Sequence, residues 1–544
     1  MYKLKHLIKN NGNLIIQIFF FFFLIAIGLN LYNDFGVSMD EDAYKKISLV
    51  EYKFLKTLFF ETGFKNFNIL YQKYLSDEPN KVSGFFYNFV YLINEFSNIF
   101  FKVSIELKKI SHILLNLIFI VANFCLFKII LNRFNNYYYA YLSVLILFFT
   151  PRFFAESFYN NRDIYFLSIS LFSFFYLQKL FLNFTFKNII IYSFLIATLI
   201  NAKIFGLVFF VISIFFFILE YENSYKTNKL IIKILLFIFF SIFFTILITP
   251  YLWSSPLNNF INFYFKDLII TSQIRVSNLF YSKLFSSLNS PWYYYLVWIL
   301  VTIPTTYVIL IFSGFFYKSA FFLKKIITQS DYKNPWTNKN ELFDAYTILI
   351  CLIFLFVMSR VSNVNYDGWR HIYFLYPYLL INIFFILEIF NKNKYLKTLL
   401  SLLIMINVIS NIYWIKKNHP FQNIFFNNIN NFFLKKKFDL DYWGLSNYQA
   451  YKFILKNDYR NQISIGTLSF NDLIDNYNIL DINEQKRIVL LQEDMLPDYF
   501  IDNYRVGYKV FKTTSNKNKI LYNYSKYKEF VVDNNVLLTI YKKN

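Results

Sequence analysis

Runs of apolar residues constrain this chain more than any other feature of its sequence. Most are close to twenty residues long and carry few charges, the length that a helix needs to cross a hydrocarbon layer of roughly 30 Å. The first run covers residues 13–32; three lysines precede it, but no small-residue cleavage site follows, so an uncleaved span is expected. Further spans are expected near residues 111–131, 137–150, 164–181, 188–202, 204–220, 230–250, 295–316, 343–359, 371–389 and 396–414. The sequence therefore predicts an all-α polytopic membrane protein with about eleven transmembrane helices.

The composition agrees with a membrane protein and excludes several other classes. The chain is 56% hydrophobic, whereas soluble domains average roughly 45–50% apolar residues. Its formal net charge of +22 comes with abundant Lys, Asn, Ile, Phe and Tyr, a bias typical of an AT-rich genome, so no nucleic acid partner is expected. Cys125 and Cys351 both fall inside apolar runs, where neither a disulfide nor a metal site is expected. No Gly-rich phosphate loop is present, so no nucleotide-binding fold is expected.

The charges of the connectors predict the topology. One set carries Lys and Arg with little else, and the positive-inside rule places it in the cytoplasm: Lys3 to Lys9, Lys128 and Arg133, Lys179 and Lys187, Lys226 to Lys233, Lys318 to Lys325, and Lys392 to Lys397. The N-terminus is then cytoplasmic, and an odd number of spans places the chain after about residue 415 outside. We therefore expect a membrane core at residues 1–415 and a small extracytoplasmic (periplasmic) α/β domain at residues 416–544.

Short patterns give the expected elements outside the spans. The tail should contain a helix from Ser446 to Leu455 and strands at residues 463–465, 488–491 and 536–541. In the first long outer loop, the apolar stretch from Phe85 to Phe101 is interrupted by polar residues. We therefore expect it to form a helix that lies on the membrane surface rather than a span.

The predicted outer loops mix acids with cations close to the ends of spans. These loops run from Asp34 to about Ser111, Pro151 to Asp163, Asn201 to Phe205, Pro250 to about Tyr294, and Arg360 to His371. The candidate acids among their residues are Asp40, Glu41 and Asp163. The candidate basic residues are Arg152, Arg162, Lys203, Arg370 and His371. Helix packing could bring both groups together at one membrane face.

Sugar transfer from a lipid phosphate to a hydroxyl group needs both kinds of residue. A carboxylate takes the proton of the attacking hydroxyl, which is otherwise a poor nucleophile. Fixed cations stabilise the charge that develops on the departing lipid phosphate. Both must lie at the membrane surface, because the carrier lipid holds the sugar there.

Other interpretations of these residues stay open. Charged residues at span ends often only flank a helix, and Lys203 could extend to the interface as a snorkelling side chain. His371 has no second histidine nearby that would suggest a metal site. Asp439 and Asp441 match a D-x-D pattern that we interpret as structural.

Four motifs, in the same order and on the same predicted face, resemble those of a known family. They are Asp40-Glu41 in the first outer loop, residues 151–163, Tyr366 to His371 with the following Phe374 to Pro377, and a junction containing His419-Pro420 and Asp441 to Gly444. The chain resembles the GT-C superfamily of lipid-phosphate-sugar glycosyltransferases, in the branch of the dolichyl-phosphate-mannose–protein mannosyltransferases and the bacterial aminoarabinose and Rgt-type transferases. The likeness runs from about residue 13 to 455. One departure is Asn161-Arg162, where relatives often have Pro-Lys before the aspartate.

The resemblance implies an inverting transferase that uses a polyprenyl-phosphate-linked sugar as donor. It assigns the base to Asp40 and the second outer acid to Asp163, with Glu41 and Asp42 close enough to blur the assignment. Arg370 and His371, with Arg152 or Lys203, would bind the lipid phosphate, and Arg162 keeps the charge of the second motif. The acceptor would be a glycan, a lipid or a protein in the cell envelope, outside a bacterial inner membrane. No cofactor is expected, and dependence on a divalent metal stays open.

Two rival functions remain. A transporter or flippase of a lipid-linked saccharide would place ionisable residues deep within spans and would show two related halves, neither of which the sequence displays. A polysaccharide polymerase or ligase would use similar chemistry on a longer donor.

Overall fold

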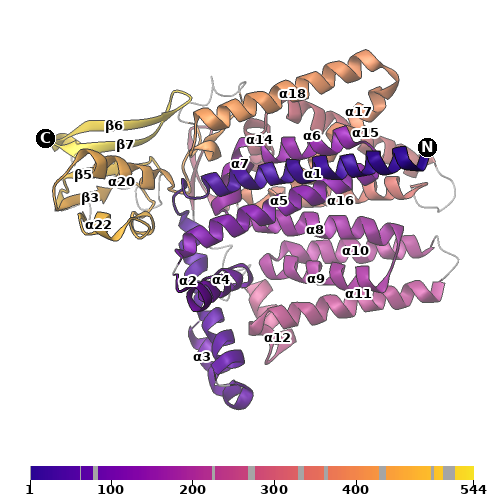
Figure 1. Ribbon diagram of the computed structural model, residues 1–544, viewed down its shortest axis with the longest axis horizontal. Helices are drawn as coiled ribbons and strands as arrows, with labels where there is room; N and C mark the ends of the chain where they lie inside the picture. Colours follow the sequence, from indigo (N-terminus) through magenta and orange to yellow (C-terminus); the bar gives the residue numbers. More distant parts are fainter. Residues whose placement is uncertain are drawn as a thin grey trace.

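The structure is a computed structural model that describes residues 2–61, 63–77, 84–103, 105–222, 227–266, 276–328, 336–360, 365–427, 437–491, 495–505 and 521–544. Long helices lie side by side in one body, with the N-terminus at one end and a small β-containing domain at the other (Figure 1). An odd number of membrane crossings predicts that the N-terminus and the C-terminal domain lie at opposite ends of the helical body. Of the residues named above, Lys226 lies outside the described residues, as do parts of three predicted outer loops (78–83, 267–275 and 361–364).

Eight helices within the described ranges are long and apolar enough to cross a membrane. They are α1 (Tyr2–Leu31), α5 (Leu107–Phe134), α8 (Asp163–Leu182), α11 (Thr227–Ile248), α15 (Thr305–Thr328), α16 (Lys339–Arg360), α17 (Leu375–Ile389) and α18 (Lys394–Lys417). A bent pair, α6 (Tyr137–Phe148) and α7 (Pro151–Tyr159), makes a ninth if it is counted as one span. Two shorter apolar helices, α9 (Phe186–Ala202) and α10 (Phe205–Glu222), lie where the remaining two spans are predicted. The predicted multi-span helical architecture is confirmed.

Two predicted spans are interrupted, each next to a proline. The run at 295–316 divides into α14 (Tyr294–Thr302) and α15, with Pro304 between them. The run at 137–150 ends at Phe148, and the chain turns by 67° before α7 begins at Pro151. Proline lacks the N–H that would continue the hydrogen bonds of the preceding turn, but it fits the first position of a new helix. The bend places the second predicted motif in a short buried helix.

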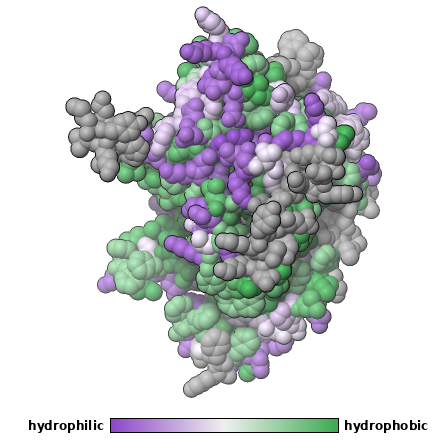
Figure 2. All heavy atoms as spheres, turned by 90° about the vertical axis from the view of Figure 1, so that its right-hand side faces the viewer, coloured by the Kyte–Doolittle hydropathy of each residue, from purple (hydrophilic) through white to green (hydrophobic). Residues whose placement is uncertain are grey.

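The outer faces of several helices carry large exposed apolar side chains, as expected for contact with lipid tails. Examples are Phe19 in α1, Phe239 in α11 and Ile409 in α18, each at least 60% exposed. Figure 2 views the body from the end that carries the N-terminus, and hydrophobic residues prevail over the lower half of that view. The helical body is therefore that of a multi-pass membrane protein.

A buried ion cluster joins helices away from the predicted outer loops. Asp344 of α16 accepts hydrogen bonds from Arg133 of α5 (Nη2, 2.7 Å) and from Lys318 of α15 (Nζ, 3.0 Å). Lys318 and Asp344 are almost completely buried. Gly314 of α15 permits the close approach of α17, because a Cβ there would lie 2.4 Å from the carbonyl oxygen of Asn382.

Three helices of the first outer loop lie across the opposite end of the body (Figure 1). They are α2 (Met39–Lys56), α3 (Phe67–Asp77) and α4 (Phe85–Phe101). The predicted helix at 85–101 is confirmed, and its position on a membrane surface stays a prediction. The two long outer loops also contain short helical turns: η1 (Thr57–Glu61), η2 (Gly63–Asn66), η3 (Pro250–Leu252), α12 (Pro256–Ile261), η4 (Asn262–Lys266) and η5 (Ser287–Asn289).

The C-terminal part contains a five-stranded sheet with the order β4-β3-β5-β7-β6. Its strands are β3 (Ile463–Thr467), β4 (Ile488–Leu490), β5 (Tyr499–Asp502), β6 (Tyr524–Val532) and β7 (Asn535–Lys543). β3 is parallel to β4 and β5, whereas β7 is antiparallel to β5 and β6. α20 (Ser446–Asn457) packs on this sheet, and α21 (Ile474–Tyr477) and α22 (Ile482–Gln485) follow β3. The predicted helix and three strands are confirmed, and β5 and β6 were not predicted.

The sequence also missed a hairpin in the second long outer loop. β1 (Ser277–Phe280) pairs with β2 (Lys283–Ser286) through Tyr281 and Ser282, both of which have positive φ. Its Phe280 forms a bridge with Phe438, which lies in the predicted tail domain.

Residues after α18 contribute to two different cores. Phe438, Tyr442 and Trp443 pack with the helical body. The side chains from Ala450 onward form the core of the sheet. The domain boundary at 415/416 stays a prediction.

Candidate active site

Four element ends bring one acid or one cation each to the same place. Asp40 is the second residue of α2, and Asp163 is the first residue of α8. Lys203 lies in the tight turn between α9 and α10, and Arg370 lies in the short helix η7 (Arg370–Ile372), just before α17. These four side chains form one connected ion cluster. The convergence expected from the sequence is therefore present for this subset.

Arg370 is the centre of the cluster. Its Nη1 donates to Asp40 Oδ2 at 2.8 Å and to Asp163 Oδ2 at 3.3 Å, and its Nη2 donates to Asp367 Oδ2 at 3.2 Å. The guanidinium also lies 4.7 Å from the ring centre of Trp443. Burial opposes its charge, but the three carboxylates raise the pKa of Arg370 well above its usual range. Arg370 is therefore a permanent cation that joins three loops.

Asp163 is the buried acid of the site. Its Oδ1 accepts a hydrogen bond from the Lys203 ammonium. Asn160 supports it twice, because Asn160 Nδ2 donates to Asp163 Oδ2 at 3.1 Å and Asn160 Oδ1 accepts from the Asp163 backbone N–H at 2.9 Å. The N-terminus of α8 further favours a negative charge at this position.

Asp40 is the accessible acid. Its side chain is 31% exposed, whereas that of Asp163 is 1% exposed. It lies in the first turn of α2, where unpaired backbone N–H groups also favour a carboxylate. An acceptor hydroxyl could therefore reach Asp40 but not Asp163.

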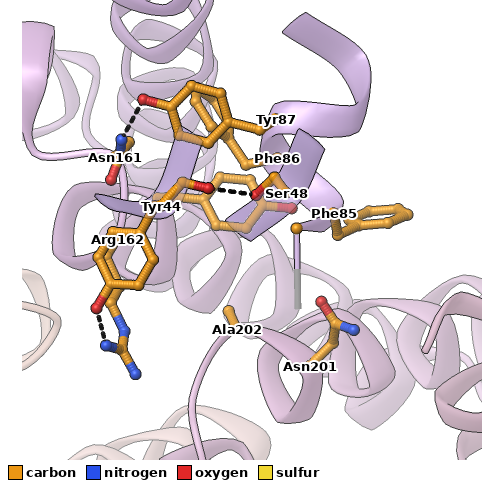
Figure 3. Close-up of a pocket in the computed structure, with 11 residues that line it drawn as sticks. Tyr44, Ser48, Phe85, Phe86, Tyr87, Asn161, Arg162, Asn201 and Ala202 are labelled. Atoms are coloured by element: carbon orange, nitrogen blue, oxygen red, sulfur yellow. Dashed lines mark hydrogen bonds between the residues drawn. The ribbon is translucent and has the colours of Figure 1, made fainter. Parts of the chain in front are cut away.

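A small pocket next to the cluster contains a further cation, Arg162 (Figure 3). Its Nη1 donates to the hydroxyl of Tyr44, and its guanidinium carbon lies 5.0 Å from the centre of the Tyr44 ring. Its buried Nε has no hydrogen-bond partner within the described residues. The remaining walls of the pocket are mostly aromatic and amide side chains: Ser48, Gly84, Phe85, Phe86, Tyr87, Asn161, Tyr165, Asn201 and Ala202.

His371 follows Arg370 but carries no charge at neutral pH. Burial and the adjacent Arg370 guanidinium hold the pKa of His371 well below its usual range. The ring packs edge-on against Tyr366, and its Nε2 is buried without a hydrogen-bond partner in the part of the chain that the structure describes. Such a ring can contact an anion through a neutral N–H but adds no positive charge.

Glu41 turns away from the cluster. It accepts from Ser111 Oγ at 2.9 Å, and its Oε2 lies 3.3 Å from His112 Nε2. His112 Nδ1 contacts the carbonyl oxygen of Tyr32 at 3.0 Å. Successive residues of a helix are about 100° apart around its axis, so Asp40 and Glu41 face different partners despite their adjacency.

Arg152 also lies outside the ion cluster. Its Nε donates to the carbonyl oxygen of Phe425 at 3.0 Å, and its guanidinium lies over the rings of Phe426 and Trp298 at 5.0 and 5.4 Å. No ion pair connects it to Asp40 or Asp163 in the described ranges. Its contacts are those of a residue that binds the segment after α18 to the helical body.

Two residues that extend the cluster beyond Arg370 were not predicted as site residues. Asp367 was noted only as part of a motif, and Arg505, which donates to Asp367 Oδ1 at 2.5 Å, comes from the segment after β5. Nothing in the local sequence around Arg505 indicates this contact, which links residues 138 positions apart.

The D-x-D pair has the structural role that the sequence suggested. Asp439 Oδ2 accepts from the backbone N–H of Leu279 in the hairpin at 2.8 Å. Asp441 accepts from the backbone N–H of Ser446, at 2.9 Å, where α20 begins. Within the described residues no three His, Cys, Asp or Glu side chains form a group that could hold a metal ion. Metal dependence stays open.

No family model matches this chain, and no curated protein matches its sequence. Among solved structures, the chain is similar to the crystal structure of ArnT from Cupriavidus metallidurans bound to undecaprenyl phosphate. The two are 9% identical, the alignment covers 95% of this chain and 97% of that chain, and the TM-score is 0.41.

Proposed function

We propose that this protein is an inverting glycosyltransferase of the GT-C type that moves one sugar from a polyprenyl-phosphate carrier to an acceptor hydroxyl at the outer face of a bacterial inner membrane. The observation that supports this most is the Asp40–Arg370–Asp163–Lys203 cluster, in which one carboxylate is accessible and the other is buried. The cluster lies where the loops between apolar helices meet, as a reaction on a lipid-tethered headgroup requires.

In the proposed reaction Asp40 is the base. It takes the proton of the acceptor hydroxyl as that oxygen attacks the anomeric carbon of the donor sugar. The bond between the anomeric carbon and the phosphate oxygen breaks at the same time, on the opposite side of the sugar. The products are the glycosylated acceptor, with inverted configuration, and the free polyprenyl phosphate.

The cations stabilise the departing phosphate. Arg162 is suited to this role because it lines the pocket beside the cluster and has an unused Nε donor. Fixed charge-assisted donors in a site shielded from water stabilise developing negative charge strongly. Lys203 and Arg370 keep Asp163 paired, so its negative charge does not oppose the phosphate.

The test is the lipid composition of source cells that lack the gene, measured by mass spectrometry of lipid extracts. We expect a polyprenyl-phosphate monosaccharide to accumulate. Expression of the gene from a plasmid in the same cells should return this lipid to its wild-type level. If carrier-linked sugars are unchanged while a saccharide remains on the cytoplasmic leaflet, the protein is a transporter or flippase. If longer carrier-linked chains accumulate, it is a polymerase or ligase.

A further inference from the structure

Arg505 connects the C-terminal sheet to the ion cluster. It lies three residues after β5, its side chain is 4% exposed, and its Nη2 donates to Asp367 Oδ1 at 2.5 Å. Its Nε and Nη1 have no hydrogen-bond partner in the described part of the chain. Asp367 is therefore the carboxylate that holds this buried guanidinium.

Asp367 is shared between two arginines. Its Oδ1 binds Arg505 and its Oδ2 binds Arg370 Nη2. The contacts form an alternating series from the C-terminal domain to the turn between α9 and α10: Arg505, Asp367, Arg370, then Asp40 and Asp163, and finally Lys203. Three cations and three carboxylates give this series a formal charge of zero. Each member has an oppositely charged neighbour, as buried charges require.

The backbone around both ends of the Arg505–Asp367 pair is fixed. Asp367 and Gly368 adopt positive φ (56° and 75°), and Gly368 N–H donates to the hydroxyl of Tyr294 at 3.2 Å. On the other side, the Arg505 carbonyl accepts from Phe470 N–H at 3.0 Å, and the Arg505 N–H donates to Asn503 Oδ1 at 3.2 Å. The pair therefore joins two backbone segments that are each held by hydrogen bonds.

We propose that Arg505 is a positioning residue that fixes Arg370, and through it Asp40. While Arg505 holds Oδ1 of Asp367, Arg370 bonds to Oδ2 alone, and its Nη1 stays on Asp40 and Asp163. Without Arg505, both oxygens of Asp367 are open to Arg370. Arginine and carboxylate prefer a two-bond fork geometry, which would draw Arg370 toward Asp367 and weaken its contact with Asp40.

Trp443 offers a readout that does not depend on catalysis, because the Arg370 guanidinium lies 4.7 Å from its ring centre. The full-length protein, labelled with 5-fluorotryptophan in detergent micelles, should give one ¹⁹F signal for each of its seven tryptophans. Trp443→Phe assigns the signal of interest. We expect Arg505→Met to shift it and Arg505→Lys to keep it close to the wild-type position.

Two controls separate this role from a general effect on folding. Asp367→Asn leaves residue 505 as arginine but removes the carboxylate that Arg505 and Arg370 share, and it should shift the Trp443 signal as Arg505→Met does. Arg460→Met removes an exposed arginine that pairs with Asp458 in the same domain and should leave the signal unchanged. If Arg505→Met does not fold, the position of the Trp443 signal in Asp367→Asn is the test of the proposal. An unshifted Trp443 signal in a folded Arg505→Met or Asp367→Asn protein would overturn the proposal.

An activity measurement extends the test and rests on the proposed function. In the transfer reaction we expect Arg505→Met to lower kcat at least tenfold with little change in KM, and Arg505→Lys to restore most of it. Equal kcat in Arg505→Met and wild type would overturn the positioning role. If the wild-type protein transfers no sugar, the proposed function fails, while the ¹⁹F signal still decides whether Arg505 positions Arg370.

Discussion

Arg370 Nη1 and Asp40 Oδ2 lie 2.8 Å apart, although 330 residues separate them in the sequence. The arginine is almost completely buried, and the aspartate is the more exposed partner. A fixed buried cation thus holds an accessible carboxylate at the place where an acceptor could arrive. This arrangement distinguishes Asp40 from the other acids of its loop.

Replacing Lys203 should destabilise the protein. Lys203→Met leaves Asp163 with Arg370 as its remaining cation, and breaking a buried ion pair typically costs about 3–5 kcal/mol. We expect a clear fall in the apparent unfolding temperature of the purified protein in detergent. The matched control is Lys46→Met, whose side chain is 70% exposed and pairs with Asp42. An exposed pair contributes about 1 kcal/mol or less, so equal shifts in the two variants would contradict the account.

The turn that carries Lys203 depends on a glycine. A Cβ at Gly206 would lie 2.2 Å from the backbone nitrogen of Ile200, so alanine cannot fit unless α9 and α10 move apart. Gly206→Ala should therefore cost roughly 1–3 kcal/mol, as overpacking does, and should reduce sugar transfer by displacing Lys203. Thermal unfolding and the transfer assay measure the two effects.

Gly12→Ala is the control, because a Cβ at Gly12 meets nothing within 4 Å. Full stability and activity in Gly206→Ala would show that the spacing of this turn does not matter.

Glu51 should make stability depend on pH. It is buried in α2, where Asn88 Nδ2 donates to it at 2.6 Å, and burial raises its pKa from an ordinary 4.5 to about 7. Between these values the folded protein keeps the proton that the unfolded chain has lost. The folded state is therefore most favoured below pH 4.5 and loses about 3 kcal/mol as the pH rises to 7.

Glu51→Gln removes this titration and keeps an acceptor for Asn88. We expect the variant to be more stable than the wild type at pH 8 and similar at pH 4.5, by unfolding temperatures measured at both values. A wild-type advantage at pH 8 would contradict the assignment.

The sequence predicted the parts of this structure that depend on local composition. Apolar run length located the helices, and loop charges selected the segments that meet at the site. Within those segments Asp40, Asp163, Lys203 and Arg370 do converge, because each lies in a turn or at a helix end at the same end of the helical body.

Side-chain direction and distant contacts were harder to predict. Glu41 follows Asp40 directly, yet the turn of α2 carries it to Ser111 and His112. The span predicted at 295–316 ran through Pro304, and the structure breaks there into α14 and α15. Arg505 gave no local signal, since its partner Asp367 is 138 residues away and belongs to another part of the fold.

The proton acceptor in the proposed reaction is the most direct point to test. Membranes from cells that lack the gene would contain both the accumulated donor and the acceptor, and purified protein can be added to them. The rate at which free polyprenyl phosphate appears, followed by mass spectrometry, then measures transfer. Asp42→Asn is the matched control, because Asp42 lies in the same acidic run but pairs with Lys45 and Lys46.

General base catalysis typically contributes about 10²- to 10⁴-fold to a rate. We expect Asp40→Asn to bind polyprenyl phosphate but to lose transfer by a factor in that range, while Asp42→Asn transfers sugar at close to the wild-type rate. Transfer by folded Asp40→Asn at the wild-type rate would contradict the assignment of Asp40 as the base.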